Sequence, residues 1–256
     1  MPTRKDCMRL TEPPRRIALL TDFGAGPYIG QMQLLLSAIA EGTPVFSLLA
    51  DLVPFRPDLA GYLLPGLSAR MPNATLYVCV VDPGVGSGRG VLAASIGDSW
   101  LIGPDNGLLV PSIQTDPRAR VYRVAWRPPG LSDSFHGRDL FAPLAARLVH
   151  GELPEATPVP PDSIVGADWP TSLAKVCYVD RFGNLISGLP ASDLDPAAKL
   201  SVGDFEVGHA RTFCEVPVGQ PFWYEDAFGL LEIAVNQGRA DRVLGLSPGD
   251  ELPLPH

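Results

Sequence analysis

The sequence predicts two domains: an α/β domain with a largely parallel sheet over residues 1–165, and a small all-β domain over residues 166–256. Up to about residue 151, short apolar runs alternate with stretches of helical periodicity, which is typical of a parallel sheet covered on both faces. Between 152 and 171 the chain is rich in proline, as a connecting segment often is. Later residues show only short strand-like runs separated by turn residues.

The elements of the first domain can be assigned in chain order. We expect strands at 17–20, 44–49, 75–81 and 99–102, and helices at about 32–39, 58–69 and 140–149. Met32, Leu36 and Ile39 recur at the spacing of one helix face. Pro65 interrupts the second helix, because proline lacks the backbone donor that a helix interior needs. The run TLYVCVV is the strongest strand signal in the chain.

Composition excludes several classes of protein. With 46% hydrophobic and 19% charged residues, the chain cannot remain an open, disordered coil. Its net charge of −8 argues against a nucleic-acid partner, which would need a basic surface. No apolar run approaches the roughly 18 residues of a membrane helix, and the basic N-terminus lacks the apolar segment of a signal peptide. We therefore expect a cytoplasmic protein with no membrane partner.

The cysteines and histidines show no metal-binding spacing. Cys7, Cys79, Cys177 and Cys214 are far apart in the sequence. We interpret all four as ordinary reduced thiols, in keeping with a cytoplasmic location. The sequence therefore predicts no metal site.

Three of the predicted strands run into an aspartate: Asp22, Asp82 and Asp105. In open α/β sheets, ligands bind beyond the carboxyl ends of the strands. A single aspartate there could simply cap the following helix. Three in the same topological position favour a polar ligand site.

Two further residues are candidates for that site. The glycine-rich stretch DPGVGSGRG at 82–90 is neither a Walker loop nor a GxGxxG motif, but its turn returns Arg89 towards Asp82. His136 precedes the predicted helix at 140–149, where the positive potential of a helix N-terminus favours a neutral imidazole or a bound anion. A capping or surface histidine is the alternative interpretation.

In the β domain, the turn DRFGN at 180–184 follows a predicted strand. The amide of Asn184 offers both a donor and an acceptor to the edge of a heterocycle, and the ring of Phe182 could cover its face. A simple hairpin turn accounts for the same residues equally well.

Taken in order, these motifs resemble the S-adenosyl-L-methionine hydroxide adenosyltransferase family, the relatives of fluorinase and chlorinase. The segments that carry the resemblance are TDFG at 21–24, VVDPGVGSGR at 80–89, GPDNGLL at 103–109, FHGRDLFAP at 135–143, VDRFGN at 179–184 and LLEIAVNQG at 230–238. The resemblance implies a β-barrel C-terminal domain and a homotrimer with sites at subunit interfaces. It also implies a small-molecule substrate, S-adenosyl-L-methionine, which water converts to adenosine and L-methionine without a cofactor.

The same resemblance assigns roles to individual residues. Asp82, Arg89 and His136 match the family's residues that hold the nucleophilic water. The implied substrate-binding residues are Asp22 of the TDFG motif at the ribose, Phe135 near the reacting carbon, Asp180 at the methionine amino group, and Phe182 and Asn184 at the adenine; Phe23 and Gly137 complete the set. The acidic chain also suits a cationic substrate.

Two alternatives remain open at this point. The first is a 5′-halo-5′-deoxyadenosine synthase, which would use halide. By resemblance, however, halogenating relatives have a tyrosine at the position of Asp82, and fluorinases have a serine at the position of Gly137. The second alternative is a protein that binds S-adenosylmethionine or adenosine without catalysing a reaction. It is suggested by 226–229, which lacks the usual Asn-Ser pair. The loop at 25–27 is also shorter than usual, and Ala50 stands where a histidine is frequent. These changes leave the contacts to the methionine end open.

Overall fold

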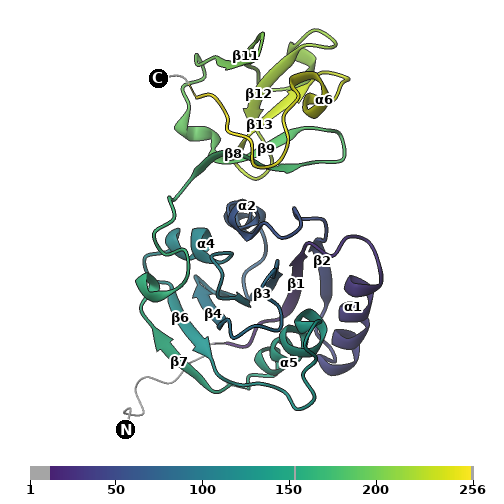
Figure 1. Ribbon diagram of the computed structural model, residues 1–256, viewed down its shortest axis with the longest axis vertical. Helices are drawn as coiled ribbons and strands as arrows, with labels where there is room; N and C mark the ends of the chain where they lie inside the picture. The colour runs from purple at the N-terminus through teal and green to yellow at the C-terminus, as the bar shows by residue number, and fades with distance from the viewer. Residues whose placement is uncertain (1–11, 153, 255–256) are drawn as a thin grey trace. The chain divides into compact units, whose positions relative to one another are not determined.

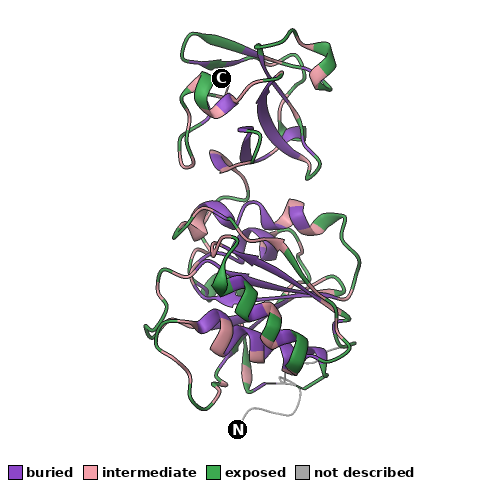
Figure 2. Ribbon diagram, turned by 90° about the vertical axis from the view of Figure 1, so that its right-hand side faces the viewer, coloured by how far each residue is buried: buried purple, intermediate pink, exposed green. Residues whose placement is uncertain are grey.

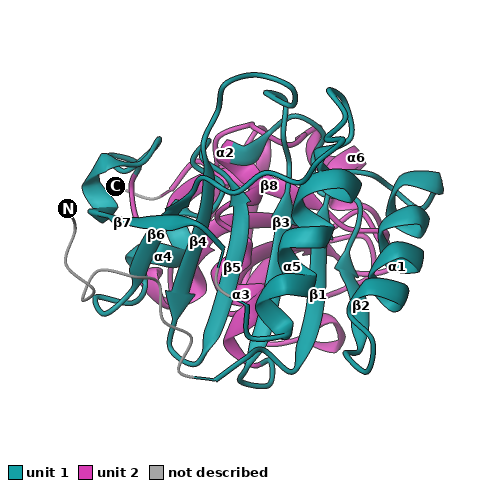
Figure 3. Ribbon diagram, turned by 90° about the horizontal axis from the view of Figure 1, so that it is seen from below, with its two compact units in different colours: residues 1–57, 71–169 teal, residues 58–70, 170–256 magenta. Residues whose placement is uncertain are grey.

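The computed structural model describes residues 12–152 and 154–254. The chain divides into two compact units, coloured separately in Figure 3. Unit 1 comprises residues 1–57 and 71–169, and unit 2 comprises residues 58–70 and 170–256. In the part of the chain that is described, no helix has the length and apolar character that crossing a membrane requires. The predicted domain boundary between 165 and 166 stays a proposal that limited proteolysis can test.

Unit 1 is built on a seven-stranded sheet with the order β2-β1-β3-β5-β4-β6-β7 (Figure 1). The strands are β1 (Arg16–Thr21), β2 (Val45–Leu49), β3 (Thr75–Val80), β4 (Val91–Ile96), β5 (Ser99–Pro104), β6 (Arg120–Val124) and β7 (Ala156–Val159). The first half of the sheet, β2-β1-β3-β5, is parallel as predicted. The second half, β4-β6-β7, is antiparallel, so the whole sheet is mixed.

Two helices, α1 (Pro27–Ile39) and α5 (Ala142–Val149), pack together against one face of this sheet (Figure 3). Leu144 and Leu148 lie one helical turn apart in α5 and are fully buried, as are Met32 and Leu36 of α1. A single turn of π-helix, Gly137–Phe141, leads into α5. The predicted helices at 32–39 and 140–149 are therefore confirmed, because their apolar stripes face the core (Figure 2).

The proline-rich segment at 152–171 is more ordered than a simple connection. Residues 156–159 form β7, which pairs only with β6 and lies at the margin of the sheet. An edge strand tolerates Pro158, since one side of its backbone needs no partner. The proline content concealed this strand from sequence-based prediction. A short helix, α4 (Val110–Gln114), follows β5.

Unit 2 contains a curled six-stranded sheet with the order β10-β11-β12-β13-β9-β8 (Figure 1). Its strands are β8 (Leu173–Val179), β9 (Leu185–Pro190), β10 (Leu200–Val202), β11 (Phe205–His209), β12 (Pro221–Glu225) and β13 (Leu230–Val235). Neighbouring strands are antiparallel except β11 and β12. Trp223, Leu231 and Ile233 lie in its core, which confirms the small β domain.

The helical signal at 58–69 belongs to unit 2 and is split in two. The pieces are α2 (Pro57–Ala60) and α3 (Leu64–Ala69). Pro65 occupies the first turn of α3, where its missing donor costs nothing, so the break comes before the proline rather than at it. In this unit, the short helix α6 (Ala240–Leu244) was not predicted, because five residues are too few to produce a helical period in the sequence.

Candidate active site

The three residues predicted to act together, Asp82, Arg89 and His136, are in direct contact in unit 1. Nε of Arg89 donates to both carboxylate oxygens of Asp82 at 2.8 Å, and Nη2 makes a further contact with Oδ2. The same Nη2 lies 2.9 Å from Nδ1 of His136. The side chains of Asp82 and Arg89 are only 5% and 9% exposed. One guanidinium therefore joins a carboxylate and an imidazole in a nearly water-free environment.

Local geometry explains how Arg89 reaches Asp82. Asp82 follows the buried strand β3, and the next residues turn back through hydrogen bonds from Val85 to Asp82 and from Ser87 to Gly84. Gly86 adopts a positive φ of 79°, which favours glycine. A Cβ at Gly86 would come within 2.4 Å of the carbonyl oxygen of Asp133. The missing side chain thus allows the segment that precedes His136 to lie against this turn.

His136 is buried at the start of the π-helical turn. Burial is the main cause that lowers its pKa, and the positive charge of Arg89 lowers it further. The charge of Asp82 and a hydrogen bond to the Ser132 backbone oppose this effect. The predicted neutral imidazole is therefore favoured, chiefly by desolvation and Arg89.

A second guanidinium, that of Arg127, was missed by the sequence analysis. Its positive charge contributes to the lowered pKa of His136. Nη1 of Arg127 donates to the carbonyls of Val124 and Trp126 at 2.8 Å. Because β6 runs in the same direction as β5, Arg127 follows a strand end at the edge of the sheet where Asp82 lies. A strand predicted at the position of β6 would have revealed Arg127 as a candidate, because Arg127 follows the end of that strand.

Asp22 and Asp105 also follow parallel strands, but they differ in their surroundings. Oδ2 of Asp22 accepts the Phe55 backbone N–H at 3.1 Å. Burial raises the pKa of Asp22, and the nearby charge of Asp82 adds to the increase. Asp105 instead binds Arg123 at 3.0 Å and the backbone N–H of Val165 at 2.9 Å. Asp22 thus belongs with Asp82, whereas Asp105 has a structural role.

An aromatic cluster adjoins these residues. The rings of Phe23 and Phe135 lie 5.7 Å apart, and Tyr28 lies 5.3 Å from Phe135 in an edge-on arrangement. Gly137 packs against the same cluster: a Cβ there would come within 2.9 Å of the Phe23 ring and 3.1 Å of the Met32 sulfur. The predicted unit 1 residues therefore form one continuous group.

The three predicted residues of unit 2 share the turn between β8 and β9. Oδ1 of Asp180 accepts the backbone N–H of Asn184 at 2.8 Å, and Oδ2 accepts its side-chain N–H at 3.2 Å. Asn184 is buried, whereas the Phe182 ring is 74% exposed. Gly183 has a φ of 88°, and a Cβ there would contact Arg239 and Asp241. The turn is thus rigid at Asn184 and presents Phe182 to solvent.

The structure describes three of the four cysteines. Cys79 and Cys177 are buried and Cys214 is exposed, while Cys7 lies outside the described residues. Burial raises the pKa of the Cys79 thiol, which disfavours the reactive thiolate. Across residues 12–152 and 154–254, no three His, Cys, Asp or Glu side chains are arranged to hold a metal ion.

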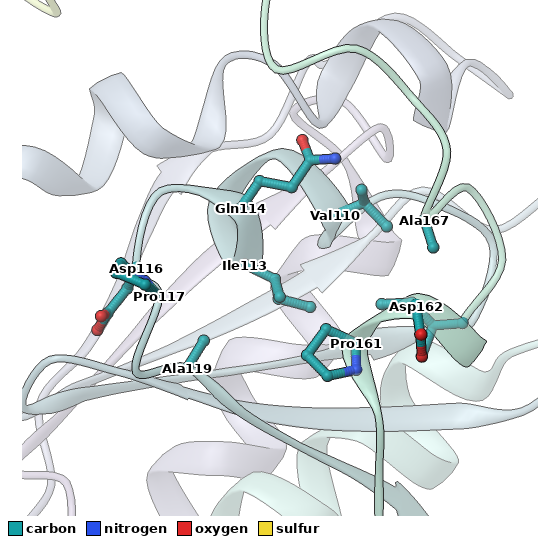
Figure 4. A pocket seen from close by; sticks show the side chains of 10 residues that line it. Val110, Ile113, Gln114, Asp116, Pro117, Ala119, Pro161, Asp162 and Ala167 are labelled. Atoms are coloured by element: carbon teal, nitrogen blue, oxygen red, sulfur yellow. The ribbon is translucent and has the colours of Figure 1, made fainter.

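A cavity of about 320 Å³ lies elsewhere in unit 1 (Figure 4). It is lined by α4, by the turn that precedes β6 and by the segment at 161–167. Its lining includes Ile113, Gln114 and Pro161, but none of the predicted site residues. The cavity is therefore separate from the candidate active site.

Comparison with known proteins identifies the family. Models of the S-adenosyl-L-methionine (SAM) hydroxide adenosyltransferase N-terminal and C-terminal domains match residues 17–157 and 174–253. An (R)-S-adenosyl-L-methionine hydrolase from Thermus thermophilus is 36% identical over 255 residues, covering 92% of this chain and 97% of that protein. One from Salinispora arenicola is 35% identical over 253 residues, covering 92% and 96%.

Solved structures agree with this result. The crystal structure of an uncharacterized conserved protein from Thermotoga maritima has a TM-score of 0.82 at 29% identity and covers 94% of this chain and 100% of its own. That of a conserved hypothetical protein from Thermus thermophilus has a TM-score of 0.75 at 36% identity, with the same coverage. The chain belongs to the SAM hydroxide adenosyltransferase family.

Proposed function

We propose that this protein hydrolyses S-adenosyl-L-methionine to adenosine and L-methionine. The oxygen of water bonds to the ribose C5′, the C5′–S bond breaks, and its electron pair returns to sulfur. One water proton remains on the new hydroxyl group and the other is released. The observation that carries the proposal is the direct contact of Asp82, Arg89 and His136 in a chain related to named hydrolases along nearly its whole length.

The proposed chemistry needs a nucleophile rather than a general acid. A sulfonium is already a good leaving group, so displacement depends on an in-line nucleophile in dry surroundings. The positive charge of Arg89 would favour the hydroxide-like form of a bound water. Asp82 would accept its proton, while the neutral ring of His136 accepts from Arg89 at Nδ1 and helps to hold the guanidinium in place. Because Asp82 and Arg89 are nearly buried, their electrostatic effect on that water is screened little by solvent.

The remaining residues would bind the substrate. Asp22 and Phe23 would contact the ribose, and Phe135 and Gly137 would border the reacting carbon. Asp180 would approach the methionine amino group, while Phe182 and Asn184 would contact the adenine. The proposed reaction uses no cofactor.

The sulfonium configuration is a further part of the proposal. The related hydrolases are named for the (R) form of the substrate. We expect this chain to prefer the same epimer, because a pyramidal sulfonium directs its methionine arm to one side only. Incubation with separated (R) and (S) epimers would show the preference, and equal consumption of both would contradict it.

Halide is a poor alternative nucleophile at this site. The carboxylate of Asp82 would repel a halide ion, and Gly137 is packed too tightly for an added side chain. We therefore expect no 5′-halo-5′-deoxyadenosine when chloride or fluoride is supplied. Its formation at the expense of adenosine would favour a halide-using synthase.

Chromatography of the purified protein incubated with S-adenosylmethionine tests the function directly. We expect equal amounts of adenosine and methionine to appear. If calorimetry detects binding but no methionine is released, the protein is a binding protein that lacks catalysis. Oxygen-18 from labelled water in the adenosine 5′-hydroxyl would establish attack at carbon.

Two properties of the whole protein complete the proposal. We expect a homotrimer with active sites at subunit interfaces, located in the cytoplasm. Sedimentation analysis would test the assembly, and specific activity should fall when dilution dissociates the trimer. A fully active monomer would contradict this part of the proposal without affecting the reaction.

A further inference from the structure

A second buried polar group lies in unit 2, next to Asn184. Glu232 on β13 is only 4% exposed, although it carries a carboxyl group. Tyr224 is its registered partner on β12 and donates a hydroxyl hydrogen bond of 2.5 Å to Oε1. On the other side, Glu232 pairs with Ile186 of β9, two residues after Asn184. Adjacent strands thus place a carboxyl group beside the Asn184 amide.

The Asn184 amide lies between two carboxyl groups. Its nitrogen donates to Asp180 Oδ2 at 3.2 Å. On the other side, the Asn184 side chain acts on Glu232 as a hydrogen-bond donor would, by lowering the pKa of that carboxyl group. An ionised carboxylate can only accept hydrogen bonds. Asp180 and Glu232 therefore both favour the amide orientation in which nitrogen faces them. In that orientation the carbonyl oxygen Oδ1 is directed away from the carboxylates.

We propose that Glu232 is a positioning residue that holds the Asn184 carbonyl oxygen ready to accept a hydrogen bond from the amino group at purine C6. This inference rests on the proposed function, in which Asn184 contacts the base. A 6-amino purine offers the required donor, whereas a 6-oxo purine places a second acceptor against Oδ1. A site built for a donor rejects an analogue that lacks it, because the polar groups are left unpaired.

The protonation of Glu232 would modulate this selection. The charged and titratable groups that act on it are Tyr224 from β12, Asp226 from the following turn and Asp180 from the turn after β8. Burial raises the pKa of Glu232 to about 7, and the charges of Asp226 and Asp180 add to the increase. A protonated Glu232 can donate to Oδ1, which leaves Asp180 alone to favour the original amide orientation and so weakens the preference for it. Selection for the 6-amino group should therefore strengthen as pH rises through about 7.

The test measures binding of adenosine and inosine to the full chain by calorimetry. Wild type is expected to prefer adenosine. Glu232→Gln keeps the size of the side chain but can donate as well as accept, so we expect the preference to fall by about tenfold. The matched control is Asp226→Asn, which removes a neighbouring buried carboxylate whose Oδ1 accepts from Phe228 and Leu230. The comparison is made at pH 8, above the pKa of Glu232, where the effect of Asp226 on that pKa matters least, and there the control should keep the wild-type preference.

The outcomes separate this inference from the proposed function. If wild type binds no adenosine, the proposed function fails and the role of Glu232 fails with it. If wild type prefers adenosine and Glu232→Gln keeps that preference, or Asp226→Asn loses as much, only the role of Glu232 is overturned. If Glu232→Gln does not fold, the pH dependence of binding to the wild-type protein tests the inference by itself. Its adenosine-to-inosine affinity ratio should rise several-fold from pH 6 to pH 8, and a constant ratio would overturn the inference.

Discussion

Nη2 of Arg89 lies 2.9 Å from Nδ1 of His136, and this contact determines which ring nitrogen carries the proton. A guanidinium has donors only, so Nδ1 must act as the acceptor. A neutral His136 therefore holds its proton on Nε2. Arg89 also donates to both oxygens of Asp82, so its own orientation is set from two sides.

Replacing Asp82 by Asn should abolish most of the hydrolysis. The substitution keeps the shape of the side chain but removes the charge that pairs with Arg89 and could accept a proton from water. We expect kcat to fall by about 100- to 10,000-fold, the usual contribution of a positioned acid or base. Release of adenosine, followed by chromatography, is the measurement.

Asp105→Asn is the matched control, since Asp105 follows the neighbouring strand β5 and binds Arg123 instead. It should lower the melting temperature while leaving kcat close to that of wild type. A well-folded Asp82→Asn protein with normal turnover would show that the assignment of the nucleophile site is wrong.

The pH dependence of the reaction should reflect His136. Its pKa is lowered from the usual 6.5, mainly by burial and then by Arg89, so the neutral ring persists below that pH. We expect kcat/KM to be maintained as pH falls to 6.5 and to decline only at lower pH. Arg127→Gln removes a positive charge that lowers this pKa, so the decline should begin at a higher pH.

Arg118→Gln serves as the control for Arg127→Gln, because the Arg118 side chain is 86% exposed and pairs with Asp116. Its pH profile should match that of wild type. If the acidic limb of the Arg127→Gln profile stays in place or moves to lower pH, Arg127 does not act on His136. Titration of the His136 ring by NMR provides the same comparison without turnover.

Gly137→Ser should destabilise the protein and create no halide activity. The new Cβ would press against the Phe23 ring at 2.9 Å, and overpacking of this kind costs about 1–3 kcal/mol in the free energy of unfolding. Gly30→Ala is a suitable control, because no atom lies within 4 Å of the added Cβ and alanine favours the helix. Denaturant unfolding distinguishes the two: equal stability of both variants would mean that the cluster repacks freely.

Glu232 should make the protein less stable as the medium becomes less acidic. Its pKa is about 7 in the folded chain and 4.5 when unperturbed, so the folded state binds more protons between these values. The contribution of Glu232 to the free energy of unfolding is therefore fully present below about pH 4.5 and is lost as pH rises through about 7. Glu232→Gln removes this loss, and its melting temperature relative to wild type should be higher at pH 8 than at pH 5. If the difference in melting temperature between Glu232→Gln and wild type is the same at pH 5 and pH 8, the pKa of Glu232 is not raised.

Local sequence patterns predicted the parts of the fold that have strong local signals. The run TLYVCVV became β3, whose described residues are all buried, and the leucine spacing near residue 144 became α5. By contrast, β4 contains two alanines and a serine, and β7 contains a proline, so neither shows a clear strand pattern. These strands form because the growing sheet offers them hydrogen-bonding partners.

The sequence by itself determined that Asp82 and Arg89 would meet, since the two residues are seven positions apart and the glycine-rich turn that joins them needs no distant contact. It also placed Asp22 near Asp82, because adjacent parallel strands end at the same edge of a sheet. Local patterns left the position of His136 open, and only the family resemblance implied that it acts with Arg89; the tertiary structure decided that contact. The tertiary structure alone pointed to Glu232 near Asn184. Such pairs depend on which loops and strands pack together, and neither periodicity nor spacing encodes that packing.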